Sequence, residues 1–290
     1  MNIAILGPRG FVGRKLIPLL EAQGHLVTGY VLDHKTDGSN GVYSESVLEL
    51  LKLPFSKVNK YDVVINLAAR RSTRIQTFTE SEVHYFTYEI PKEFISRTAS
   101  SSTLVLNSST YIQNFKGVTG RTVDSYGAAK EKLSQFLEGQ SLERQVPTRD
   151  LFFFTMYGKG DRPGHLIPLL LKAANTREKI LLSPGYQLMN LLYVDDAVQN
   201  ILKCISQEPI PNYQKSRVWS DEYFSVRELV SKIQSVIGLD IDCEWGKREY
   251  VGHEMMEPWP VPMKELPEFD APTSLESGIK KIWLEVELDL

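Results

Sequence analysis

Close to its start the chain contains Ile3-Ala4-Ile5-Leu6-Gly7-Pro8-Arg9-Gly10-Phe11-Val12-Gly13, and this stretch decides the fold. Four apolar residues form a run of strand size, and a loop with three glycines follows it. Beyond the loop, apolar residues recur at helical spacing as far as Leu20. Gly24 can end that helix, and a second strand-like run covers Leu26–Leu32. The first 32 residues therefore predict strand, glycine loop, helix and strand.

Strand-sized and helix-sized segments continue to alternate along the chain, which is typical of a parallel sheet covered by helices. We predict an α/β fold, a doubly wound parallel sheet of Rossmann type with a smaller C-terminal α/β substrate lobe. Residues 1–155 are expected to form the dinucleotide-binding domain, with 186–206 returning to it. Residues 156–290, in which prolines become frequent, are expected to form mainly the substrate-binding lobe. The expected strands are 63–67, 104–106 and 151–154, and the expected helices are 81–97, 126–139, 166–174 and 225–237, with a strand-helix pair at 191–205.

Composition excludes several classes of protein. The 290 residues are 42% hydrophobic and carry 36 acidic against 33 basic side chains, a net charge of −3, so nucleic acid is not an expected partner. No stretch reaches the roughly 20 apolar residues of a membrane helix. Two cysteines cannot build a disulfide framework, and the histidines show no metal-ligand spacing, so no metal is expected. We predict a cytoplasmic protein.

The glycine loop lies between a strand and a helix, where glycines let the backbone approach a pyrophosphate at a helix N-terminus. A tight turn that needs glycines only for their φ angles would have the same sequence pattern. Residues further along the chain therefore have to distinguish a nucleotide-binding loop from a simple turn. The expected cofactor-binding residues of the loop are Gly7, Arg9, Gly10, Phe11, Val12 and Gly13.

Cofactor choice depends on the end of the second strand, where an acidic residue usually binds the ribose hydroxyls of NAD. Val31 stands at the expected place, and Asp33 comes two residues later. The Arg9 guanidinium could instead pair with the 2′-phosphate of NADP. NADP(H) is therefore favoured, and Asp33 keeps NAD(H) possible.

Tyr126 and Lys130 are four residues apart at the start of an expected helix, so they share one face. A neighbouring ammonium lowers the pKa of a tyrosine towards a range useful for acid-base chemistry. Upstream, the strand that begins at Leu104 ends in hydroxyl residues, among them Ser108 and Ser109, which can hydrogen-bond a carbonyl oxygen. These are the parts of a carbonyl reductase site.

Together with the segment Asp62–Ala69 and the later Tyr193–Ala197, these motifs occur in the order of an extended short-chain dehydrogenase/reductase. The chain resembles that family, the NAD-dependent epimerases and dehydratases, over nearly its whole length. Its sequence most resembles those of bacterial nucleotide-sugar reductases, such as the enzymes that make CDP-abequose or GDP-fucose.

The resemblance implies residue roles. Tyr126 would be the proton donor, Lys130 would hold the nicotinamide ribose, and either Ser108 or Ser109 would orient the carbonyl. Leu67, Ala68 and Ala69 would line the cofactor. Arg70, Thr155 and Arg248 would contact the substrate. Arg71 and Arg74 belong to the same basic loop as Arg70, which could neutralise a diphosphate or simply be solvated.

The resemblance also implies an activity: NADPH-dependent reduction of a nucleotide-linked 4-keto-6-deoxysugar by a homodimer. A nucleotide-sugar 4-epimerase that retains NAD and a non-catalytic sensor of NADP(H) are the alternatives. Two departures from the family matter. No carboxylate follows Ser109, which disfavours dehydration, and Met189 stands where an arginine usually grips the substrate pyrophosphate. Asp195 and Asp196 are expected to cap the helix that follows them rather than bind a metal.

Overall fold

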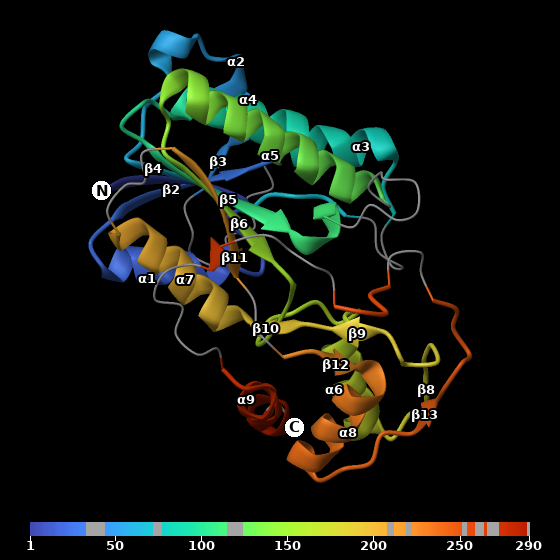
Figure 1. The fold of residues 1–290 in the computed structure, drawn as a ribbon. Helices are drawn as coiled ribbons and strands as arrows, with labels where there is room; N and C mark the ends of the chain where they lie inside the picture. Colours follow the sequence, from blue (N-terminus) through green and yellow to red (C-terminus); the bar gives the residue numbers. More distant parts are fainter. Residues whose placement is uncertain are drawn as a thin grey trace. The chain divides into compact units, whose positions relative to one another are not determined.

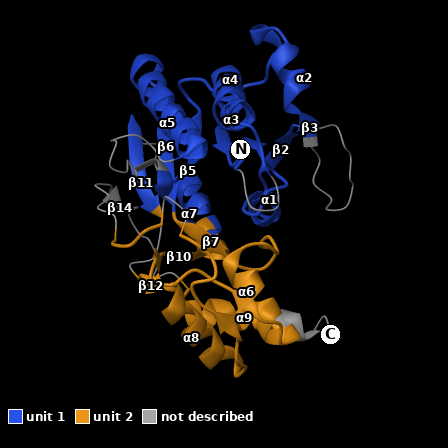
Figure 2. Cartoon of the chain, turned by 90° about the vertical axis from the view of Figure 1, so that its right-hand side faces the viewer, with its two compact units in different colours: residues 1–153, 198–217, 263–266 blue, residues 154–197, 218–262, 267–290 orange. Residues whose placement is uncertain are grey.

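The computed structural model describes residues 1–32, 44–71, 77–114, 124–207, 212–218, 222–250, 254–258, 264–265 and 273–288. The chain divides into two compact units (Figure 2). Unit 1 contains residues 1–153, 198–217 and 263–266, and unit 2 contains residues 154–197, 218–262 and 267–290. The segment that returns to unit 1 is thus 198–217, where the sequence predicted 186–206.

Unit 1 is built on one sheet of eight described strands in the order β14-β11-β6-β5-β4-β1-β2-β3 (Figure 1). Neighbouring strands from β3 to β6 all pair in parallel. The predicted Rossmann-type α/β fold is confirmed. The strands are β1 (Asn2–Leu6), β2 (Leu26–Val31), β3 (Ser44–Ser46), β4 (Val63–Asn66), β5 (Leu104–Thr110), β6 (Thr148–Phe153), β11 (Tyr213–Val218) and β14 (Lys264–Glu265).

Helices cover both faces of this sheet, with α3, α4 and α5 on one face and α1 and α7 on the other (Figure 1). Because helices cover both faces, the central strands are almost completely buried. All four residues of β4 and all six of β6 are buried. The helices and turns are α1 (Gly13–Ala22), α2 (Val47–Lys52), η2 (Phe55–Lys57), α3 (Glu80–His84), η3 (Tyr85–Glu89), α4 (Ile90–Thr98), η4 (Tyr111–Asn114), α5 (Ser125–Arg144) and α7 (Val194–Ser206).

The sequence predicted one helix over residues 81–97, and the structure interrupts it with the π-helical turn η3 between α3 and α4. Pro91 lies at the start of α4. A proline inside a helix has no N–H to donate and its ring collides with the carbonyl four residues earlier. The wider π turn before Pro91 relieves that collision, which a reading of apolar spacing alone does not reveal.

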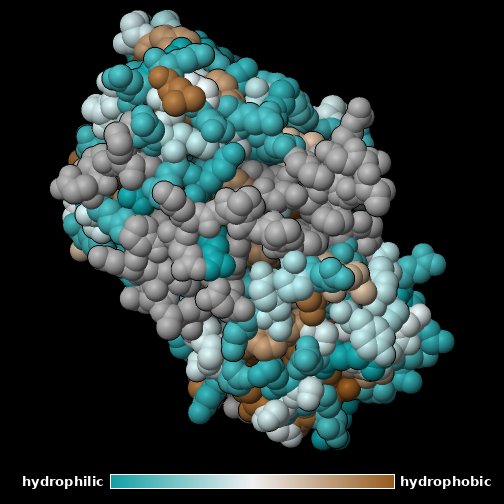
Figure 3. All heavy atoms as spheres, in the orientation of Figure 1, coloured by the Kyte–Doolittle hydropathy of each residue, from teal (hydrophilic) through white to brown (hydrophobic). Residues whose placement is uncertain are grey.

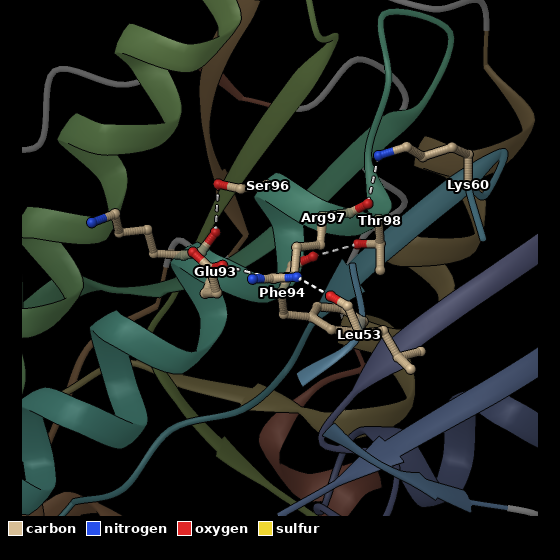
Figure 4. A network of polar contacts seen from close by, with 8 residues as sticks. Leu53, Lys60, Glu93, Phe94, Ser96, Arg97 and Thr98 are labelled. Carbon is tan, nitrogen blue, oxygen red and sulfur yellow. Dashed lines mark hydrogen bonds and ion pairs between the residues drawn. The ribbon is translucent and has the colours of Figure 1, made fainter. Parts of the chain in front are cut away.

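The C-terminal end of α4 is tied to its surroundings by polar contacts (Figure 4). Arg97 Nε donates to Glu93 Oε1 over 2.6 Å, and Arg97 Nη1 donates to the carbonyl of Leu53 over 2.7 Å. Lys60 Nζ donates to the carbonyl of Arg97. The last carbonyls of a helix have no partner within the helix, and Lys60 provides a donor for that of Arg97. The bond from Arg97 to Leu53 links α4 to the end of α2.

Unit 2 has its own apolar core, formed by three helices and short paired strands. Its last helix, α9, was not predicted from the sequence. Gly278 of α9 packs so closely on Tyr157 that a Cβ there would lie 2.2 Å from the phenolic oxygen. The elements are β7 (Thr155–Tyr157), α6 (Leu166–Thr176), β8 (Ile180–Leu181), β9 (Leu188–Met189), β10 (Leu191–Tyr193), β12 (Phe224–Ser225), α8 (Val226–Ile237), β13 (Cys243–Glu244) and α9 (Leu275–Leu288).

The face of the molecule drawn in Figure 3 is mostly hydrophilic, with small apolar areas scattered across it. Large exposed apolar residues occur in both units, as Leu26 of unit 1 (73% exposed) and Tyr186 of unit 2 (61% exposed) illustrate. Within the described residues, no helix combines the length and the apolar character that crossing a membrane requires.

Candidate active site

The glycine loop follows β1 at the place where the strand order of the sheet reverses, between β1 and β4. Open α/β sheets bind ligands in the crevice outside the carboxyl ends of their strands at such a point. Gly7 has a φ of +88°, and a Cβ on it would lie 3.0 Å from the backbone nitrogen of Ala68. A Cβ on Gly13 would lie 2.5 Å from the carbonyl oxygen of Pro8. Both glycines are therefore required by close backbone packing.

Helix α1 begins directly after this loop, and no side chain caps its first turn. Its N-cap residue, Val12, cannot accept a hydrogen bond with its side chain. The N–H groups of Arg14 and Lys15 in this turn donate to the carbonyls of Gly10 and Val12. The helix dipole favours negative charge at this end. Gly10 and Arg9 are exposed beside this end. The glycine loop and the positive end of the helix dipole fit the pyrophosphate of a dinucleotide.

Leu67, Ala68 and Ala69 follow β4 and lie against the loop, since the Leu67 N–H donates to the Leu6 carbonyl. The buried side chain of Asn66 braces this segment, because its Oδ1 accepts the N–H of Ala68 over 3.1 Å. The sequence did not single out Asn66. Its position as a polar residue at the end of an apolar strand was the signal available.

Tyr126 and Lys130 lie on the first turns of α5. The side chain of Asp124 caps this helix by accepting the N–H of Gly127 over 2.6 Å, which is why α5 starts here. Tyr126 is half-buried and Lys130 is only 2% exposed. The four-residue spacing places both on one face of α5.

Burial raises the pKa of Tyr126 to about 12. The Arg71 guanidinium, 5.4 Å from the centre of the tyrosine ring, opposes this rise, and so does a hydrogen bond with the Thr110 hydroxyl. The sequence assigned the lowering of this pKa to Lys130, but in the structure Arg71 is the cation that lowers it. Arg71 also lies 3.8 Å from the Asp124 carboxylate, so one ion pair spans the start of α5.

Lys130 projects from α5 towards the end of β5, where its Nζ donates to the carbonyl oxygen of Ser108 over 2.5 Å. Burial lowers the pKa of this lysine to about 8, and the nearby Asp150 carboxylate counteracts part of the fall. Near neutral pH the side chain is thus a cation that can lose its proton easily.

The three hydroxyl residues at the end of β5 have different surroundings. Ser109 is buried, and its hydroxyl donates to Asp150 Oδ1 over 2.5 Å while also contacting the Ser134 hydroxyl. Ser108 is only partly buried. Thr110, which the sequence did not nominate, is the residue that meets Tyr126. Neighbouring strand residues point to opposite faces, and only tertiary packing shows which hydroxyl meets the tyrosine.

Two arginines of the expected basic loop, Arg70 and Arg71, make cation–π contacts with aromatic rings. The Arg70 guanidinium lies 3.7 Å from the centre of the Phe86 ring and 5.0 Å from that of Phe78. Its backbone N–H donates to the Thr87 hydroxyl over 3.0 Å. Arg70 is thus anchored against the α3–α4 region, and Arg71 is the member of the pair that reaches Tyr126. Arg74, like the possible ribose ligand Asp33, lies outside the described residues.

Two nominated substrate residues belong to unit 2. Thr155 opens β7 opposite Leu191 of β10. The backbone N–H of Arg248 donates to the Leu182 carbonyl over 3.1 Å, which fixes the turn that contains it. Met189, in the place of the family's arginine, lies in β9 opposite Phe224.

No group of three or more His, Cys, Asp or Glu side chains among the described residues is arranged to hold a metal ion. Asp196 instead accepts hydrogen bonds from both the backbone N–H and the hydroxyl of Thr273, just before α9. This contact ties the first turn of α7 to the C-terminal segment.

Comparison with known proteins yields a family and a set of relatives. Residues 3–214 match the description of the NAD dependent epimerase/dehydratase family. Protein CapI of Staphylococcus aureus is 28% identical over 249 residues, which cover 74% of this chain and 72% of that protein. The CDP-abequose synthase of Yersinia pseudotuberculosis is 28% identical over 144 residues, about half (49%) of each chain.

Solved structures with the same fold have low sequence identity. MoeE5 in complex with UDP-glucuronic acid and NAD has a TM-score of 0.82 at 19% identity, with both chains fully covered. UDP-glucuronic acid 4-epimerase from Bacillus cereus, also bound to UDP-glucuronic acid and NAD, has a TM-score of 0.79 at 16% identity, again over the full chains. These similarities establish the fold.

Proposed function

The chain belongs to the NAD dependent epimerase/dehydratase family, and on that premise we propose that it is an NADPH-dependent reductase of a nucleotide-linked 4-keto-6-deoxysugar. The observation behind the proposal is the placement of Tyr126. Its phenol and Lys130 lie on one face of α5, and Lys130 reaches the end of β5, where the hydroxyl residues are. In a reductase this phenol would be the proton donor.

The cofactor would be held by the glycine loop. Gly7 and Gly13 allow the loop to pack closely on the backbone of Ala68 and Pro8, and the positive end of the α1 dipole would face the pyrophosphate. Arg9 would contact the 2′-phosphate, and Leu67–Ala69 would lie beside the cofactor. When bound, a reduced nicotinamide supplies hydride to the keto carbon.

The residues of the chain then have to deliver one proton to the carbonyl oxygen. Tyr126 would donate its phenolic proton to the carbonyl oxygen as the carbon is reduced, which turns the ketone into an alcohol. Thr110 is in contact with the tyrosine and would orient its hydroxyl. Ser108 is the serine that we favour for holding the carbonyl oxygen, because the hydroxyl of Ser109 is already engaged by Asp150. Lys130 would bind the nicotinamide ribose and restore the proton.

A nucleotide sugar is the proposed substrate class. Two curated relatives match the chain at 28% identity, one of which is named a CDP-abequose synthase. The structural neighbours MoeE5 and the Bacillus cereus epimerase are complexes with UDP-sugars.

The test is an absorbance assay of NADPH with CDP-, dTDP-, GDP- and UDP-linked keto sugars. We expect protein purified without added cofactor to be largely empty and to oxidise one NADPH per keto sugar consumed. Tyr126→Phe serves as the matched inactive control. Interconversion of saturated sugar nucleotides by tightly bound NAD, with no net NADPH consumption, would replace the reductase with the epimerase. Cofactor binding with no turnover of either kind would favour the sensor.

A further inference from the structure

Three charged residues are buried as whole residues in the part of the chain that the structure describes: Lys130, Arg149 and Asp150. Burial of a charge costs free energy unless the charge is compensated. Lys130 has a role in the proposed function, but nothing assigned so far explains Asp150, which is completely shielded from solvent in the middle of β6.

Asp150 ends a row of polar side chains that crosses the sheet on the α5 side. Asn66, Asn107 and Asp150 stand at registered positions of the neighbouring strands β4, β5 and β6. Asn66 Nδ2 donates to Asn107 Oδ1, and Asn107 Nδ2 donates to Asp150 Oδ1, each over 2.7 Å. At its other end the row reaches the N–H of Ala68, beside the glycine loop.

In every hydrogen bond described for the Asp150 side chain, the carboxylate is the acceptor. Oδ1 accepts from Asn107 and Ser109, and Oδ2 accepts from the Tyr213 hydroxyl of β11 over 2.7 Å. Burial and the carboxylate itself raise the pKa of Tyr213 far above its usual value, so this phenol remains a donor. Such a set of donors suits an ionised carboxylate, which can only accept.

Arg149 is not the cation that balances this charge. Successive strand residues point to opposite faces of a sheet, so Arg149 and Asp150 project to different sides of β6. Arg149 is hydrogen-bonded to the thiol of Cys204 on α7, the helix that covers the other face. On the α5 side, the Ser109 hydroxyl that donates to Asp150 also contacts the hydroxyl of Ser134, which lies one turn after Lys130 on α5. Lys130 is therefore the buried cation near the Asp150 carboxylate, and the carboxylate increases its proton affinity.

We propose that Asp150 is a positioning residue: a buried counter-charge for the Lys130 ammonium, fixed by Asn107, Ser109 and Tyr213. The interaction between the two charges does not depend on any activity. Its consequence for proton transfer does rest on the proposed function, because only there does Lys130 need its ammonium.

The ionisable groups around the pair set the pH range of the test. Tyr213 on β11 and Tyr126 on α5 both have raised pKa values and stay neutral, and Glu138 of α5 acts on Tyr213. In the unfolded chain the pKa of the lysine is about 10.4, whereas in the folded protein it is about 8. The buried ammonium therefore exists at about pH 6 and is largely absent at about pH 9.5.

The decisive experiment is thermal unfolding of the full chain at those two pH values. Asp150→Asn should lower the unfolding temperature more at about pH 6 than at about pH 9.5, because only at the lower pH does it leave an ammonium without its counter-charge. In a Lys130→Met background the pH dependence of this loss should disappear. Tyr213→Phe, which removes one hydrogen bond but no charge, is the matched control and should cost the same at both pH values.

A second readout uses catalysis. If the proposed reductase activity is found, Asp150→Asn should move the alkaline limb of kcat/KM to lower pH by about one pH unit or more, whereas Tyr213→Phe should leave it in place. An equal loss of unfolding temperature at both pH values, the same pH dependence without Lys130, or failure of Asp150→Asn to fold in both backgrounds would make the role structural and overturn the proposal. Failure of the activity alone leaves the unfolding result intact, so the two ideas are tested separately.

Discussion

Burial and two charged neighbours, Arg71 and Asp124, have the largest influence on the proton affinity of Tyr126. The tyrosine is half-buried, Arg71 lies over its ring, and Asp124 both caps the helix and pairs with Arg71. Desolvation is the strongest of these influences and raises the pKa to about 12. The side chain is therefore a protonated phenol that can donate its proton, unless a cofactor or substrate changes its surroundings.

Tyr126→Phe should lower kcat by about 10²-fold or more, because it removes the general acid, while cofactor affinity stays nearly unchanged. Lys130→Met should reduce both cofactor affinity and kcat, because that residue has both roles. Steady-state kinetics and titration of NADPH fluorescence measure the two effects. Turnover close to wild type in Tyr126→Phe would contradict the assignment.

The pH dependence of the reduction should follow Lys130. Its pKa, about 8, is lowered by burial, so the ammonium is present below this value and is lost above it. We expect kcat/KM to be nearly flat on the acid side of pH 8 and to fall as the pH rises through 8 and beyond. A profile that instead rises through this range would mean that the neutral amine is the active form.

At the scale of elements, the β1–loop–α1 unit depends on close backbone contacts. Gly13, the first residue of α1, packs against the carbonyl of Pro8, and Gly7 packs against the segment after β4. These contacts place the N–H groups of α1 beside the carboxyl ends of β1 and β4. The unit is built for close approach rather than for flexibility.

Gly13→Ala should destabilise the protein by about 1–3 kcal/mol and weaken dinucleotide binding, because the added methyl group would lie 2.5 Å from the Pro8 carbonyl. Gly139→Ala is the matched control. That glycine lies within α5 with open space around it, and alanine there should stabilise the helix by about 0.5–1 kcal/mol. Urea unfolding followed by circular dichroism measures both changes. Similar effects at both positions would show that the close packing at Gly13 is unimportant.

At the scale of the whole molecule, the chain consists of two units with separate apolar cores. The residues assigned to the cofactor all belong to unit 1, and two nominated substrate residues, Thr155 and Arg248, belong to unit 2. Ligand binding to the native state stabilises the whole chain against unfolding, so cofactor choice can be measured without knowing the substrate.

NADPH at 100 times its Kd should stabilise the protein by about 2.7 kcal/mol, and NADH at the same concentration should stabilise it less. The difference should come from Arg9, through a phosphate contact of about 1.5–3 kcal/mol. Thermal unfolding with each cofactor measures the effect, and Arg9→Ala should abolish the preference. Equal losses for both cofactors in that variant would make Arg9 structural and favour NAD.

Much of the fold was predictable because its signals are local. Apolar runs separated by glycine and by helical spacing identified β1, α1, β2, β4, α5, β6 and α8 to within a few residues, and their alternation predicted the parallel sheet. The strand-helix pair expected at 191–205 corresponds to β10 and α7. The π turn before Pro91, the other short strands of unit 2 and α9 were missed. Those elements depend on contacts with distant parts of the chain.

The candidate site divides in the same way. By itself, the sequence determined the glycine loop, the order of the motifs and the Tyr126–Lys130 pair, because loop length and helical spacing act between near neighbours in the chain. Only the tertiary structure decided that Ser109 meets Asp150, that Arg71 lies over Tyr126 and that Asn66, Asn107 and Asp150 form one row. These contacts join residues up to 55 positions apart, as with Arg71 and Tyr126, and they follow from strand register and side-chain direction, which are set when the sheet and its helices pack together.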